Sequence, residues 1–214
     1  PKLFAEMLHA TERVDESLAR LTEVGQQDMK ANVSALKAAC AAFAPGRTIP
    51  ECMAKMSASK PIDGPVAEAT RQLDTLQAFL RSKDLVTIPG TEVAHVRESP
   101  PYQRANSAYI DIPGPCEKDL PSIYYIAPAD PKWSREEQAS YIPGVRDLLF
   151  TSVHEVWPGH FLQFLHANRS PSTLGQLFVG YAFAEGWAHY TEEMMWDAGL
   201  GAGDPETHIG QLSN

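Results

Sequence analysis

The chain has 214 residues, 43% of them hydrophobic and 21% charged, with a formal net charge of -9 at pH 7. Such values are ordinary for a folded globular domain. The negative charge argues against general electrostatic binding of nucleic acid or of an anionic membrane. No run approaches the roughly 18 consecutive apolar residues of a membrane span, so no span is expected in this chain. The expected partner is therefore a peptide or a small molecule.

The first 90 residues are predicted to be helical. Apolar residues recur at helical spacing through residues 3–43, which predicts two helices with a break near Gly25. The turn APGRTIPE and a short helix follow, and residues 65–83 are again amphipathic. We divide the chain into a helical segment, residues 1–90, and a catalytic core, residues 91–214, which together form one continuous structural unit.

The three cysteines are poor candidates for metal ligands, because they do not show the paired C-x-x-C spacing of a zinc site. Cys40 and Cys52 flank the turn APGRTIPE. They could close a short loop in an oxidising compartment, and the paired and the free state are equally open at this point. If they pair, Cys116 is left without a disulfide partner.

The middle of the chain is predicted to form a sheet. Between Leu85 and Tyr125, prolines and glycines separate short runs rich in Val, Ile and Tyr, such as TEVAHV, SAYIDI and SIYYIA. These runs predict a small antiparallel sheet. Ser134 is then a helix N-cap, and two long apolar helices are expected over residues 144–169 and 174–201. The predicted fold class is mainly α with a small antiparallel β-sheet (α+β).

The segment VHEVWPGH, residues 153–160, is close to the zincin motif H-E-x-x-H. In that motif two histidines four residues apart bind zinc from one face of a helix, and the adjacent glutamate polarises the metal-bound water. His154 and His160 are six residues apart, which places them about 120° out of register on a regular helix. Pro158 and Gly159 lie between them and predict a distorted helix. A π-type bulge that absorbs two residues would restore a common face.

The predicted site contains zinc, held by His154, His160 and Glu185, with Glu155 as the general base. Glu185 lies on the following helix, which can return antiparallel beside the first. Both glutamates occur in strongly apolar helices, where a buried carboxylate is costly unless it is paired or bound to metal. His189 lies one turn after Glu185 and is the second catalytic candidate, as a hydrogen-bond donor to a metal ligand, an oxyanion stabiliser or a substitute ligand.

Other polar and aromatic residues have open or structural interpretations. Glu192 either orients a ligand histidine or lies on a solvated helix face. Four histidines are not expected to bind metal: His9, His95, His166 and His208. Seven aromatic residues are expected to pack in the core or in strands: Tyr109, Tyr124, Tyr125, Trp157, Tyr181, Phe183 and Trp187.

The segments HEVWPGHFLQ and AFAEGWAHYTEE resemble the bacterial domain-of-unknown-function 885 family, whose signature is His-Glu-x-x-Pro-Gly-His followed by Glu-Gly-Trp-Ala. The resemblance implies a gluzincin-like metallopeptidase with a thermolysin-like or oligopeptidase-like helical core. It also implies that His154, Glu155, His160 and Glu185 have the roles given above. His189 stands where a leucine is more usual, so its role belongs to this sequence. Members are typically longer, and we expect a fragment with segments missing on both sides.

The predicted function is therefore a zinc-dependent peptidase that cleaves peptide bonds with metal-activated water. Two alternatives stay open: a metal-dependent hydrolase of non-peptide amides or esters, and a non-catalytic helical binding protein with a degenerate metal site. The cysteine pair and the frequent export of family members favour a periplasmic or cell-envelope location, with the cytoplasm as the alternative.

Overall fold

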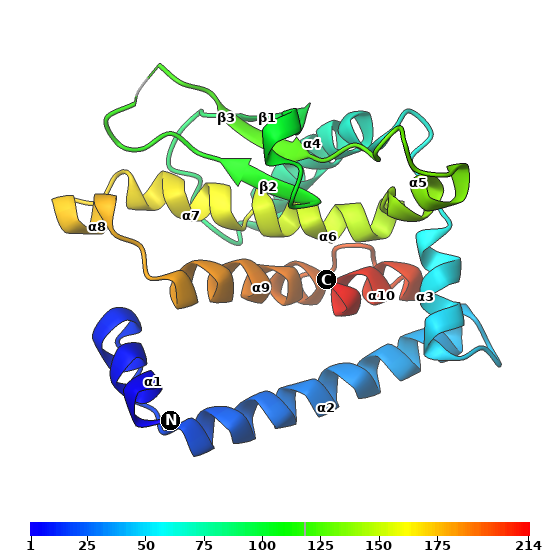
Figure 1. Ribbon diagram of the computed structural model, residues 1–214, viewed down its shortest axis with the longest axis horizontal. Coiled ribbons are helices and arrows are strands. Elements are labelled where there is room, and N and C mark those ends of the chain that lie inside the picture. The colour runs from blue at the N-terminus through cyan, green and yellow to red at the C-terminus, as the bar shows by residue number, and fades with distance from the viewer. Residues whose placement is uncertain (118) are drawn as a thin grey trace.

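Figure 1 shows a computed structural model of the chain, which describes residues 1–117 and 119–214. The small sheet lies near the top of the view, most of the helices lie below it, and one long helix runs along the bottom. In chain order the elements are α1 (Lys2–Met7), the π-helix η1 (Leu8–Glu12), α2 (Leu18–Phe43), α3 (Ile49–Ser57), α4 (Pro65–Lys83), β1 (Ala94–Glu98), the 3-10 helix η2 (Pro101–Gln103), β2 (Ala108–Asp111), β3 (Ser122–Ile126), α5 (Arg135–Tyr141), α6 (Val145–Glu155), α7 (His160–Ala167), α8 (Thr173–Leu177), α9 (Tyr181–Asp197) and α10 (Pro205–Ser213).

The predicted fold class is confirmed, with one correction to the sheet. The three strands form a mixed sheet in the order β1-β3-β2, in which β1 runs parallel and β2 antiparallel to β3. The prediction of a wholly antiparallel sheet was wrong. Strand β3 is almost entirely buried, whereas β1 and β2 are partly exposed, so the most apolar strand takes the centre and its neighbours become the edges.

Helix boundaries also differ from the predicted ones. The N-terminal helices separate around residues 13–17, where Ser17 caps α2, and α2 continues through Gly25. Each of the two long helices predicted near the C-terminus is divided, into α6 and α7 and into α8 and α9. The start of α5 agrees with the prediction, because Ser134 and Glu137 form a capping box.

Two hydrophobic clusters hold these elements together. The larger one joins α4, the sheet, α6 and α7, with fully buried side chains such as Leu76, Tyr124 and Phe161. The smaller one joins α2 and α3 to α10, where Ile209 is fully buried. A disulfide between Cys40 and Cys52 links α2 to α3 within the smaller cluster, and Cys116 is a free, exposed cysteine.

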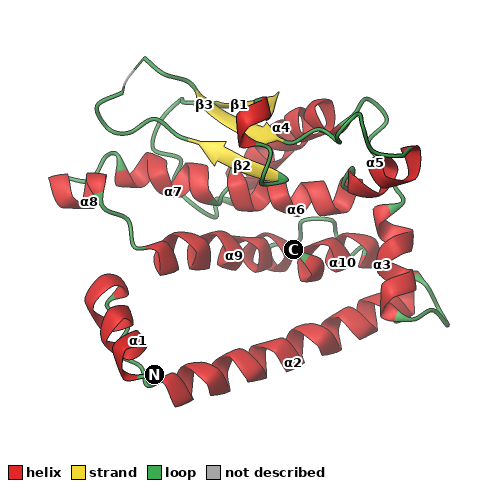
Figure 2. Cartoon of the chain, viewed as in Figure 1, coloured by secondary structure: helices red, strands yellow, loops and turns green. Residues whose placement is uncertain are grey.

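In Figure 2 the sheet covers the pair α6 and α7 from one side, and α9 runs along the opposite side of the same pair. The chain segments that carry the predicted ligands therefore lie in the middle of the molecule. None of the described helices is long and apolar enough to cross a lipid bilayer.

Candidate metal centre

The predicted distortion of the HEVWPGH segment is present, as a break between two helices. Helix α6 ends at Glu155 and α7 begins at His160. Across the break, the Gly159 N–H donates to the carbonyl oxygen of Val153, six residues earlier, at 2.9 Å. The chain therefore makes one wide turn that takes up the additional residues, where a π-type bulge within a single helix was expected.

Gly159 is required by this turn because of a close backbone approach. A Cβ atom at this position would lie 1.7 Å from the carbonyl oxygen of His154. Helix α9 fixes the turn from the other side, because the Trp187 indole N–H donates to the Pro158 carbonyl oxygen at 2.9 Å. Pro158 and Gly159 of the first sequence motif and Trp187 of the second thus meet at the turn between α6 and α7.

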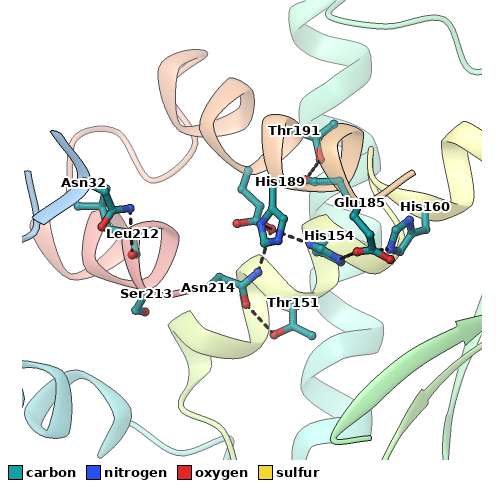
Figure 3. A network of polar contacts seen from close by, with 12 residues as sticks. Asn32, Thr151, His154, His160, Glu185, His189, Thr191, Leu212, Ser213 and Asn214 are labelled. Carbon is teal, nitrogen blue, oxygen red and sulfur yellow. Dashed lines mark hydrogen bonds and ion pairs between the residues drawn. The ribbon is translucent and has the colours of Figure 1, made fainter. Parts of the chain in front are cut away.

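The turn brings the three predicted ligands together, as Figure 3 shows. The Nε2 atoms of His154 and His160 lie 3.5 and 3.6 Å from the same carboxylate oxygen of Glu185, Oε2. The three donor atoms all lie within 4.8 Å of one another and could hold a metal ion. Tetrahedral zinc with bonds of about 2.0–2.1 Å separates neighbouring ligand atoms by about 3.4 Å. The donor set and its spacing therefore fit zinc.

Behind His154, a buried carboxylate fixes the orientation of the ring. Glu192 is 3% exposed, and its Oε1 lies 2.8 Å from His154 Nδ1. The same oxygen accepts a hydrogen bond from Asn214 Nδ2 at 2.9 Å, and Asn214 in turn contacts Thr151 Oγ1. Of the two interpretations of Glu192, the structure therefore supports the orienting one. Burial alone would lower the pKa of His154, but the hydrogen bond and charge of Glu192 outweigh it and raise this pKa.

His189 lies on the far side of this carboxylate. Its Nδ1 is 3.2 Å from Glu192 Oε1, and its ring centroid is 4.9 Å from that of His154. The group His154, His189 and Glu192 is a second set that could hold a metal ion. However, His189 lines a cavity between α2, α9 and α10, whereas Glu155 lines a different one. The catalytic role of His189 stays a prediction.

The candidate ligands open into a cavity of about 510 Å³ between β2, the α6–α7 turn and α9. Residues 108–112 of the β2 region line one wall, and Glu155 lines the cavity together with the three ligands. Burial raises the pKa of Glu155 to about 7, the charge of Glu185 acts in the same direction, and His154 opposes both. A carboxylate with such a pKa is suited to exchange protons near neutral pH.

The remaining sequence predictions have mixed outcomes. Trp157 and Tyr124 are buried as expected, and Tyr109 packs on Tyr125 with ring centroids 5.1 Å apart. The packing prediction was wrong for Tyr181 and Phe183, which are 74% and 61% exposed.

His166 lies in the last turn of α7 and donates to the Thr87 carbonyl oxygen. Asn214 and Thr151 were missed, because no motif marks a hydrogen bond between distant segments.

The solved structures that resemble this chain include the following two. The first is described as a "putative lipoprotein of unknown function" from Shewanella oneidensis, with a TM-score of 0.81 and 25% sequence identity; the match covers 99% of this chain and 40% of that one. The second is described as a "putative lipoprotein" from Colwellia psychrerythraea, with a TM-score of 0.77 and 18% identity; the match covers 98% of this chain and 36% of that one. The present chain thus spans well under half the length of both proteins.

Comparison with curated proteins gives no match. The family described as "Bacterial protein of unknown function (DUF885)" matches residues 1–214, the whole chain. This match agrees with the motifs around His154 and Glu185. The chain belongs to the DUF885 family of bacterial proteins of unknown function.

Proposed function

We propose that this chain contains the catalytic centre of a zinc-dependent peptidase with a gluzincin-like core. The observation that carries the proposal is the convergence of His154 Nε2, His160 Nε2 and Glu185 Oε2 at one cavity that Glu155 also lines. Two imidazoles and one carboxylate form the ligand set of a catalytic zinc site with an open position. The buried Glu192 behind His154 supplies the carboxylate partner that ligand histidines usually have.

Each residue has a separate role in the proposed reaction. When bound by the two histidines and Glu185, zinc lowers the pKa of water and polarises a carbonyl oxygen. Glu155 removes a proton from the attacking water, whose oxygen forms a bond to the carbonyl carbon of the substrate. Glu155 then delivers that proton to the leaving amine as the C–N bond breaks. Its pKa of about 7 suits both steps.

A peptide substrate is supported by the position of strand β2. This strand is an edge of the sheet, paired with β3 on one side, and its residues line the cavity beside the ligands. Extended peptides add to such edges through main-chain hydrogen bonds. An unstructured peptide lying along β2 would pass the ligands with a main-chain carbonyl group within the same cavity.

The cell envelope is the proposed location. The cysteine pair forms a disulfide, and disulfides persist mainly in oxidising compartments such as the periplasm. The solved proteins from Shewanella oneidensis and Colwellia psychrerythraea are each described as a "putative lipoprotein", which is consistent with this location.

The first experiment measures zinc by elemental analysis in the natural chain and in His154→Ala and Glu185→Ala. We expect about one zinc per chain, lost in both variants. Glu155→Gln should keep the zinc and lose at least a hundredfold in peptide hydrolysis, because it removes only the proton acceptor. Glu193→Gln, an exposed neighbour on α9, is the matched control and should change neither property.

Three results would contradict the proposal. Absence of zinc in the natural chain after zinc is supplied would exclude the metal centre. Bound zinc with cleavage of esters but not of a peptide panel would identify a different hydrolase, and bound zinc without any turnover would identify a binding protein.

A further inference from the structure

A second cavity, of about 450 Å³, lies between the end of α7, helix α8 and the start of α9. Its volume lies within the usual range of small-ligand pockets, about 300–1,000 Å³. Val179, in the connection between α8 and α9, lines both this cavity and the cavity of about 510 Å³ beside the candidate ligands, which we call the metal cavity. The two cavities therefore share a wall, and we call this second one the side pocket.

The side pocket is lined mainly by apolar residues, and two of its aromatic side chains are largely exposed. Phe178 and Phe183 line it and are 73% and 61% exposed. Trp187 forms a third wall, and its hydrogen bond to the Pro158 carbonyl oxygen holds the indole in place. Exposed apolar surface concentrated at a concave site is typical of ligand binding.

One polar group interrupts the apolar lining. Gln163 on α7 lines the side pocket and is only 9% exposed. Its side-chain oxygen has no hydrogen-bond partner among the described residues. Buried amide oxygens normally have a partner. This oxygen is shielded from solvent, so it can accept a hydrogen bond from a bound group once the side chain rotates toward the pocket.

Strand β2 leads from the metal cavity toward the side pocket. Soon after β2 the chain reaches Pro113, whose carbonyl oxygen accepts a hydrogen bond from Asn168 Nδ2 at 3.0 Å. Asn168 directly follows Ala167, which lines the side pocket at the end of α7. A peptide that lies along β2 therefore extends from the ligands toward this pocket.

We propose that the side pocket binds a large aromatic side chain of the substrate, next to the peptide bond that is cleaved, with preference for tyrosine or tryptophan. The proposal rests on the peptidase function proposed above and names its substrate class. The phenylalanines and Trp187 contact the ring. The amide of Gln163 accepts a hydrogen bond from the phenol or indole donor, which phenylalanine lacks.

The first test uses zinc-loaded chain and internally quenched peptides that differ in one residue, scanned through the positions around the cleaved bond. We expect kcat/KM to be at least tenfold higher with tyrosine or tryptophan than with alanine or aspartate. Gln163→Met should lower the tyrosine and tryptophan values to the phenylalanine value, a loss of about two- to tenfold. Ala167→Leu should narrow the pocket and lower all aromatic values about tenfold, while the alanine peptide stays within twofold.

Ala19→Leu, at an exposed position of α2, is the matched control and should leave every ratio unchanged. Equal rates for aromatic and small residues in the natural chain would overturn the proposal. Variants that slow all peptides by the same factor would overturn it as well, because the aromatic preference would then not depend on the side pocket.

A second test does not require turnover. A peptide carrying a benzophenone side chain at the scanned position is irradiated with the chain, and the cross-linked residues are located by mass spectrometry. We expect cross-links within residues 174–187 and a lower yield in Ala167→Leu. Such cross-links without cleavage of any peptide would reject the peptidase function and retain the pocket. Cross-links elsewhere, or none, would reject the pocket whatever the cleavage results show.

Discussion

The two regions that hold the candidate ligands achieve their geometry in different ways. Helix α9 is continuous, and Glu185, His189 and Glu192 follow one another at helical spacing on one face. His154 and His160 lie on two helices separated by the α6–α7 turn. The first arrangement follows from side-chain spacing alone, whereas the second exists only because the backbone leaves the helix at a defined place.

This difference predicts different sensitivities. In α9 the backbone tolerates substitution, and function depends on which side chains occupy the inner face. In the α6–α7 turn the backbone itself sets the distance between the two histidines. The predictions below test this contrast with paired substitutions, from the largest expected effect to the smallest.

The largest effect is expected for Gly159→Ala in the turn. The added Cβ would lie 1.7 Å from the His154 carbonyl oxygen, so the backbone must move and with it the two histidines. We expect a loss of about 3 kcal/mol or more in the free energy of unfolding. Zinc should no longer bind at one equivalent. Urea denaturation and elemental analysis measure the two quantities.

Gly186→Ala provides the matched substitution in α9, one residue after Glu185. A Cβ there meets no atom within 4 Å, and the helical backbone suits alanine better than glycine. We expect a gain of about 0.5–1 kcal/mol in stability and unchanged zinc content. A similar loss of zinc in both variants would mean that the two regions do not differ as argued.

A smaller effect is expected for Glu192→Gln, which changes a side chain and leaves the backbone of α9 intact. The carboxylate contacts His154 Nδ1 at 2.8 Å and favours the ring orientation that points Nε2 at Glu185. Its neutral replacement should weaken zinc binding by about 10- to 100-fold, the usual effect of losing such a partner. Competition with a zinc chelator measures the affinity.

Glu193→Gln removes the same charge from the neighbouring exposed position and separates orientation from general electrostatics. We expect a change in zinc affinity of less than about twofold, because an exposed charge is screened by water and salt. Equal weakening in the two variants would show that net charge, and not the contact with His154, determines the affinity.

Much of the candidate site was predictable because its signals are local. Two histidines, a proline and a glycine within one segment indicated both the ligands and the distorted helix between them. Charged Glu155 and Glu185 within apolar helices indicated a site because buried carboxylates need a partner. In both cases the physical reason depends on residues that are close in sequence, and the structure places those side chains around one cavity.

The features that were missed depend on distant parts of the chain. Three short apolar runs do not specify which strand lies in the centre, so the mixed sheet could not be distinguished from an antiparallel one. The contact of Asn214 with Glu192 joins α9 to the region after α10, and no spacing rule covers it. Tyr181 and Phe183 were expected to pack in the core because they are aromatic. Both lie at the start of α9, where their rings are largely exposed.

The smallest effect is expected at the contact between the two regions, where Trp187 of α9 donates to the buried carbonyl oxygen of Pro158 in the turn. Trp187→Phe keeps an aromatic ring and removes the donor, so the carbonyl loses its side-chain partner. We expect a loss of about 1 kcal/mol in the free energy of unfolding, the usual net value of one hydrogen bond. Trp133→Phe, at a half-exposed tryptophan before α5, is the matched control and should change stability by less than about 0.5 kcal/mol. Urea denaturation of both variants, with and without zinc, measures these changes. If α9 holds the turn, Trp187→Phe should also reduce the stabilisation that zinc provides. An undiminished zinc effect would show that the α6–α7 turn keeps its shape without this contact.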